Sequence, residues 1–179
     1  MKLFDTHTHV NFNAFKDDWR EAIDRALKND IWLINIGSQS TTSKRAVEIA
    51  ENYQQGVYAA VGLHPSHLFE ADVDISEAGE KINYKTCAEE FDENYYLELA
   101  KNEKVVAIGE CGLDYYFKIQ NSKFKNQNDN LKFKIIKKKQ IEIFLKHLEL
   151  SKKVGKPLII HCRDAHNDLL EILKAENYK

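Results

Sequence analysis

The stretch Val105-Val-Ala-Ile-Gly-Glu110 decides the fold class of this chain, because four successive apolar residues lead directly into a glycine and a carboxylate. An apolar run without polar alternation indicates a strand that is buried on both faces, which is typical of parallel sheets. Two further strand-like runs, Leu3–Thr6 and Pro157–His161, also lead into chemically active side chains. We expect these side chains to meet at the carboxyl-terminal edge of one parallel sheet.

Segments with helical periodicity alternate with the expected strands. The sequence predicts further strands at 31–36 and 57–61, and helices at 17–29, 42–53, 92–101, from within 118–139 to about 155, and at 165–176. A long acidic connection follows the third expected strand, from Leu63 to about Phe91. Five β–α units in series predict an α/β fold, which is either an open doubly wound sheet or a (β/α)₈ barrel.

Composition limits the classes of function that need to be considered. The 179 residues carry a formal net charge of −2, so global charge favours neither nucleic-acid nor membrane binding, and the length suits a single domain over 1–179. No apolar run approaches the ~18 residues of a membrane span. The three cysteines have no paired spacing, which favours a reducing cytoplasm. We expect Cys111 and Cys162 to be packing residues.

Two histidines near the amino terminus are candidate ligands for a divalent cation. Because side chains alternate along a strand, His7 and His9 would point the same way, roughly 7 Å apart. A lone pair of this kind is more often a polar strand end than a metal site. Asp5 shares their face, and its carboxylate could orient an imidazole.

The other two expected strand ends supply complementary donors. Glu110 lies between Gly109 and Cys111-Gly112, so the backbone can turn the carboxylate into a crowded centre. His161 follows Leu158-Ile-Ile, and on its own it is more simply a buried structural histidine. Together with the first pair, these residues predict a mixed histidine–carboxylate metal centre.

Two residues beside the expected centre are candidates for substrate contact. His64, in Gly62-Leu-His-Pro65, could hold a substrate oxygen or transfer a proton. Arg163 has a planar guanidinium that suits phosphate oxygens, although an ion pair with Asp164 is an equally good interpretation.

Four blocks together resemble the TatD family of metal-dependent deoxyribonucleases. They are Phe4-Asp-Thr-His-Thr-His9, Val61-Gly-Leu-His-Pro65, Val106-Ala-Ile-Gly-Glu-Cys-Gly-Leu-Asp-Tyr115 and Ile160-His-Cys-Arg-Asp-Ala165. The resemblance implies a (β/α)₈ barrel in which two divalent cations hydrolyse DNA phosphodiesters. The cations could be Zn, Mn, Mg or Ni.

The resemblance also implies a role for each residue of the site. His7 and His9 would bind one cation, His161 would bind the second, and Glu110 would bridge both. His64 and Arg163 would contribute catalytically in the substrate pocket, and Asp114, like Asp5, would support a ligand without binding an ion itself.

The chain departs from the family pattern in its length. A complete barrel needs about 250 residues, whereas this sequence supplies the first five β–α units. The family's later histidine and aspartate ligands have no counterpart here. We therefore expect a fragment with exposed strand edges, poorly active alone, unless a second polypeptide completes the barrel.

A lysine-rich stretch after the fourth expected strand could contact nucleic acid locally. Lys118, Lys123 and Lys125 are interleaved with phenylalanines, a pattern that suits phosphates and unstacked bases, but a solvated insertion explains it equally well. Two other functions remain open. The centre could hydrolyse an amide, a lactone or a phosphotriester, or the chain could be an incomplete domain that only binds a partner.

Overall fold

One curved parallel sheet organises the chain in this computed structural model. The structure describes the backbone of residues 3–69, 71–77, 80–86, 88–116 and 127–178. The strand order β1-β2-β3-β6-β7 follows the order of the chain, and every neighbouring pair is parallel. The strands are β1 (Leu3–Thr8), β2 (Ile31–Ile36), β3 (Val57–Val61), β6 (Val105–Asp114) and β7 (Leu158–Arg163).

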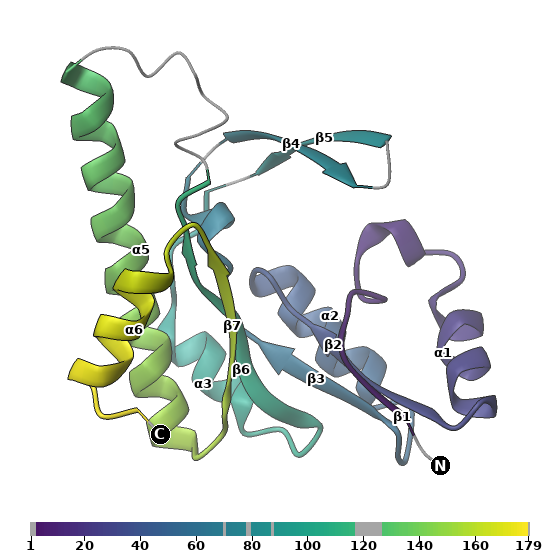
Figure 1. Ribbon diagram of the computed structural model, residues 1–179. Helices are drawn as coiled ribbons and strands as arrows, with labels where there is room; N and C mark the ends of the chain where they lie inside the picture. Colours follow the sequence, from purple (N-terminus) through teal and green to yellow (C-terminus); the bar gives the residue numbers. More distant parts are fainter. Residues whose placement is uncertain (1–2, 70, 78–79, 87, 117–126, 179) are drawn as a thin grey trace.

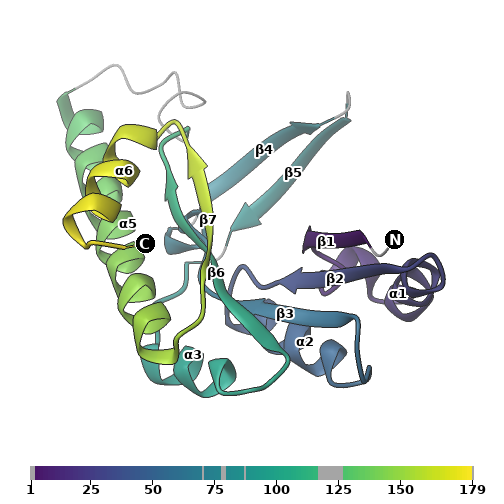
Figure 2. The ribbon, with the colours of Figure 1, turned by 60° about the horizontal axis from the view of Figure 1, so that its bottom comes forward.

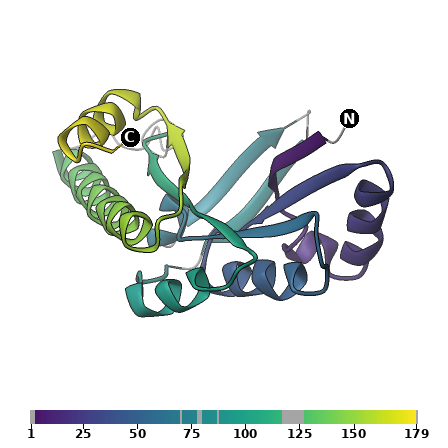
Figure 3. The same cartoon turned by 90° about the horizontal axis from the view of Figure 1, so that it is seen from below.

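The helices lie on the outer side of this curved sheet (Figure 3). They are α1 (Trp19–Lys28), α2 (Ser40–Ala50), α3 (Glu93–Ala100), α5 (Gln127–Val154) and α6 (His166–Ala175). Sequential strand order with helices on one face is the arrangement of a barrel arc, whereas a doubly wound sheet has helices on both faces. In the part of the chain that the structure describes, no helix is both long and apolar enough to cross a membrane.

Two apolar cores hold the helices against the sheet. The first contains Leu33, Val57 and Ile108 beneath α1, α2 and α3, and the second packs Leu113 and Phe144 beneath α5 and α6. Cys111 belongs to the second core, and Cys162 packs against its edge, so the expectation that both cysteines are packing residues is confirmed. A smaller group on the inner face of the sheet consists of Ile34, Ile36, Ala60 and Ala107.

The acidic connection after β3 contains a hairpin that was not predicted from the sequence. The 3₁₀ turn η2 (Pro65–Leu68) is followed by an antiparallel hairpin of β4 (Ala71–Glu77) and β5 (Glu80–Thr86), which projects from the sheet (Figures 1 and 2). The alternation in Ala71-Asp-Val-Asp-Ile75, with a period of two, is the strand signal that the acidic composition concealed.

Strand β6 continues to Asp114, beyond its expected end at Gly109, so Glu110 lies within the strand rather than at its end. Its pairing with β7 shifts register between Ile108 and Cys111. Two glycines allow the close approach of β7: a Cβ atom on Gly109 would lie 2.4 Å from the carbonyl oxygen of Ile159, and one on Gly112 would lie 2.1 Å from that of His161. The backbone beside Glu110 therefore requires residues without a side chain.

Candidate metal centre

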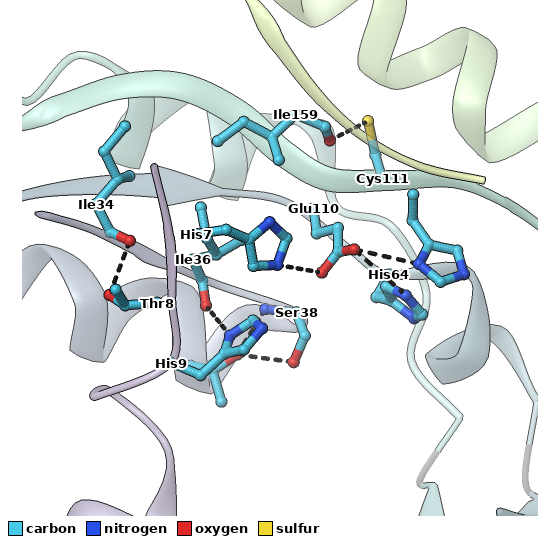
Figure 4. Close-up of polar contacts among 12 residues, drawn as sticks. His7, Thr8, His9, Ile34, Ile36, Ser38, His64, Glu110, Cys111 and Ile159 are labelled. Carbon is cyan, nitrogen blue, oxygen red and sulfur yellow. Dashed lines mark hydrogen bonds and ion pairs between the residues drawn. The ribbon is translucent and has the colours of Figure 1, made fainter. Parts of the chain in front are cut away.

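Glu110 lies at the centre of the candidate site, with a different histidine beside each of its carboxylate oxygens. Oε2 lies 3.4 Å from Nε2 of His7, and Oε1 lies 3.2 Å from Nδ1 of His161. Figure 4 shows His7 on one side of the carboxylate and His64 on the other. This is the arrangement that a carboxylate needs to bridge two cations.

The Glu110 carboxyl group is largely buried but remains ionised. Burial raises its pKa, yet the hydrogen bond from His161 and the charges of the surrounding histidines outweigh burial and lower the pKa to about 2. The group therefore offers two negatively charged oxygens at neutral pH, as hard divalent cations require.

His7 and His9 reach Glu110 from β1 and the turn that follows it. Nδ1 of His9 donates to the carbonyl oxygen of Ile36 at 3.2 Å, which leaves the lone pair of Nε2 available for a cation. Burial lowers the pKa of His9, so the ring is held in the neutral form that a metal ligand must have. Donor atoms of His7, His9 and Glu110 all lie within 4.8 Å of one another.

His161, on β7, is oriented by a second carboxylate. Its Nε2 lies 2.9 Å from Oδ2 of Asp114, which leaves Nδ1 directed at Glu110. Burial alone would lower the pKa of His161, but the hydrogen bonds and charges of Asp114 and Glu110 raise it to about 9. A carboxylate that fixes the distal nitrogen of a ligating imidazole is the usual support for a metal-bound histidine.

His64 is close enough to be counted with this second group, but its hydrogen bonds favour another role. Its donor atom lies within 4.8 Å of those of Glu110 and His161. However, Nδ1 of His64 accepts from the backbone N–H of Ser66 at 3.1 Å, so the neutral ring carries its proton on Nε2. A protonated Nε2 cannot bind a cation, whereas it can donate to an oxygen of a substrate.

The remaining predicted residues lie around this cluster without joining it. The Asp5 carboxylate accepts from the backbone N–H of His7 at 3.1 Å, and no imidazole bond to Asp5 is found among the described residues. Arg163 is exposed at the end of β7 with its guanidinium 3.5 Å from the ring centroid of Tyr116. Lys118, Lys123 and Lys125 lie outside the described residues.

Two buried polar residues of α5, Gln140 and His147, were not predicted from the sequence. They occupy positions on the apolar face of the helix, two turns apart, together with Phe144 and Leu148. A polar residue at an apolar position of a periodic helix is the signal that could have identified them.

The burial of His147 makes the folding stability of the chain depend on pH. Burial lowers its pKa to about 4, against 6.5 for an exposed histidine, so below pH 6.5 the unfolded chain binds a proton that the folded chain does not. Folding stability is therefore lost as pH falls from 6.5 towards 4. Between pH 7 and pH 5, we expect the free energy of unfolding to fall by about 2 kcal/mol more in wild type than in His147→Gln.

Urea unfolding of both proteins at the two pH values, in metal-free buffer, measures this difference. The other titrating groups are common to both chains and cancel in the comparison. Equal losses in the two proteins would contradict the proposed neutral state of His147.

The sheet is parallel and curved like a barrel wall, and a histidine–carboxylate cluster lies at the carboxyl-terminal side of its strands. This combination is characteristic of barrel-type metal-dependent hydrolases. The comparison with known families is more specific. The family described as "TatD related DNase" matches residues 4–179, and the chain belongs to this family.

Individual relatives agree with this assignment. The chain is 36% identical to the "Uncharacterized metal-dependent hydrolase YabD" of Bacillus subtilis, over 97% of this chain and 56% of that protein. It is 27% identical to the "3′-5′ ssDNA/RNA exonuclease TatD" of Pantoea ananatis, over 96% and 54%.

The fold also matches a solved structure of this family. The crystal structure of YjjV, a TatD homologue from Escherichia coli, superposes with a TM-score of 0.65 and 26% identity, over 98% of this chain and 56% of that one. The predicted barrel-type fold is confirmed. The chain spans about half the length of the relatives that it matches.

Proposed function

We propose that this chain forms the histidine-rich part of a metal-dependent phosphodiesterase that acts on single-stranded DNA or RNA. The observation that supports the proposal most directly is the Glu110 carboxylate, whose two oxygens face histidines from two different strands. The Pantoea ananatis relative is named as an exonuclease for single-stranded DNA and RNA, and this name supports the class of substrate.

The donor set fits two divalent cations. His7, His9 and Glu110 would hold one, and Glu110 with His161 would hold the other. Cations in such a centre lower the pKa of a water molecule and offset phosphate charge. Zinc, manganese, magnesium and nickel all remain compatible with mixed imidazole and carboxylate donors.

The chain's own residues have distinct tasks in this proposal. The Nε2–H of His64 would donate to a phosphate oxygen, because Ser66 fixes the tautomer of the ring. Asp114 would hold the His161 ring in place through Nε2. Arg163, steadied against Tyr116 at the end of β7, would offer its planar donors to a phosphate at the rim.

Incubation of the chain with Mn²⁺ and end-labelled single-stranded oligonucleotides of DNA and of RNA tests the proposal. We expect slow cleavage that requires Mn²⁺. His64→Leu should reduce the rate about 100-fold, because a positioned proton donor is lost, and it should leave the stoichiometry of bound Mn²⁺ unchanged.

Two outcomes would count against this scheme. Hydrolysis of a small ester, lactone or phosphotriester with intact oligonucleotides would reassign the centre to another bond. Loss of bound Mn²⁺ in His64→Leu would make His64 a ligand and contradict its role as a donor.

A further inference from the structure

Helix α5 carries two polar side chains that are almost completely buried, Gln140 at 3% exposure and His147 at 0%. They are seven positions apart, about two helical turns, so they lie on the same face of the helix. Burial of a polar group is unfavourable unless its hydrogen bonds are made. Each makes at least one of its hydrogen bonds with the backbone of a segment that carries a residue of the candidate site.

Gln140 holds the end of β6. Its Oε1 accepts from the backbone N–H of Asp114, and its Nε2 donates to the carbonyl oxygen of the same residue, both at 3.0 Å. The amide therefore pairs with both backbone polar groups of Asp114. The side chain of Asp114 in turn holds Nε2 of His161, so Gln140 acts on a cation ligand through one intermediate residue.

His147 holds the segment that follows β3 in a similar way. Its Nδ1–H donates to the carbonyl oxygen of Ile143 at 2.8 Å, and its Nε2 accepts from the backbone N–H of Leu63 at 3.0 Å. Leu63 directly precedes His64. Lys139, from the same helix, donates to the carbonyl oxygen of Leu68 at the end of η2.

We propose that Gln140 and His147 are positioning residues, through which α5 fixes Asp114 and His64 relative to Glu110. Helix α5 is bonded both to the end of β6, the strand that carries Glu110, and to the segment that follows β3, the neighbouring strand. Gln140 thus sets the orientation of His161 towards a cation, and His147 sets the position of the His64 donor. The inference rests on the cation centre of the proposed function and adds two residues that touch neither cation nor substrate.

Titration with Co²⁺ separates the two roles. Gln140→Met keeps the length of the side chain but removes its hydrogen bonds, and we expect Co²⁺ affinity to fall about 10- to 100-fold, as when a support of a ligating histidine is lost. The visible absorption bands of bound Co²⁺ report its coordination geometry, and they should differ between Gln140→Met and wild type.

His147→Phe should behave differently. It should leave the Co²⁺ affinity close to wild type, because His64 is not a ligand in this scheme. Binding of inorganic phosphate to the Co²⁺-loaded chain should weaken about tenfold, the worth of one hydrogen bond. His147→Gln, which retains an acceptor for Leu63, should restore phosphate binding.

Leu148→Val is the matched control, because Leu148 is fully buried on the same helix and lies in the apolar core. It should lower thermal stability without changing Co²⁺ or phosphate affinity. If Gln140→Met and His147→Phe resemble this control, the positioning inference is overturned while the cation centre stands. If wild type binds no Co²⁺, the centre itself is wrong and the inference falls with it.

Discussion

Glu110→Gln is expected to abolish tight binding of divalent cations by this chain. Glu110 belongs to both groups of candidate ligands, so one substitution removes a donor from each. The amide has one carbonyl oxygen and no charge, and it cannot bridge. We expect affinity for Mn²⁺ to fall more than about 100-fold, since loss of a direct ligand should exceed the 10- to 100-fold typical of supporting residues.

Isothermal titration of Mn²⁺ into chelator-treated protein measures this effect. Glu98→Gln is a suitable control, because Glu98 is exposed on α3 and pairs only with Lys101 among the described residues. Thermal unfolding in metal-free buffer shows whether the variant is folded. A folded Glu110→Gln protein with wild-type affinity and stoichiometry would exclude Glu110 as the bridging ligand.

Gly112→Ala is expected to destabilise the chain more than a glycine substitution normally does. Gly112 has φ of +139°, and an added Cβ would lie 2.1 Å from the carbonyl oxygen of His161. Because that oxygen belongs to the paired strand β7, it can move only if the pairing of β6 with β7 changes. Strain and overpacking together should cost about 3–5 kcal/mol in free energy of unfolding.

Gly155→Ala separates conformational strain from steric overlap. Gly155 also has a positive φ, +67°, but a Cβ there would have nothing within 4 Å. The cost should be about 1 kcal/mol, the ordinary penalty for an L-residue in a left-handed conformation. Urea unfolding followed by circular dichroism measures the free energy of unfolding of both variants. Equal losses of stability would show that the close approach of β7 to Gly112 does not contribute to the cost of Gly112→Ala.

The sheet was predictable because parallel strands have a strong sequence signature. Val105–Gly109 is apolar on both faces, and Ile31–Ile36 is so except for Asn35, as expected for strands of a sheet with covered faces. The same logic brought His7, Glu110 and His161 to one place, since parallel strands present their carboxyl ends along one edge. Their roles as ligands remain predictions.

The details that set the chemistry were not predictable from local sequence. The carbonyl group of Ile36 that orients His9, and the N–H of Ser66 that fixes the tautomer of His64, depend on how the backbone folds back at each strand end. Gln140 was not predicted because the apolar stripe of a helix shows which face is buried, but not which groups that face contacts. A polar residue within the stripe therefore does not reveal its hydrogen-bond partner, here the backbone of Asp114.

The distance between His7 and Glu110 has a consequence for the mechanics of the sheet. Their strands, β1 and β6, are three positions apart in the sheet, and in a flat sheet three spacings separate backbones by about 14 Å. The side-chain atoms nevertheless lie 3.4 Å apart, because the sheet bends strongly towards its inner face. A cation held by both residues would join strands that are distant in the sheet, so its binding would stabilise the bent form of the sheet.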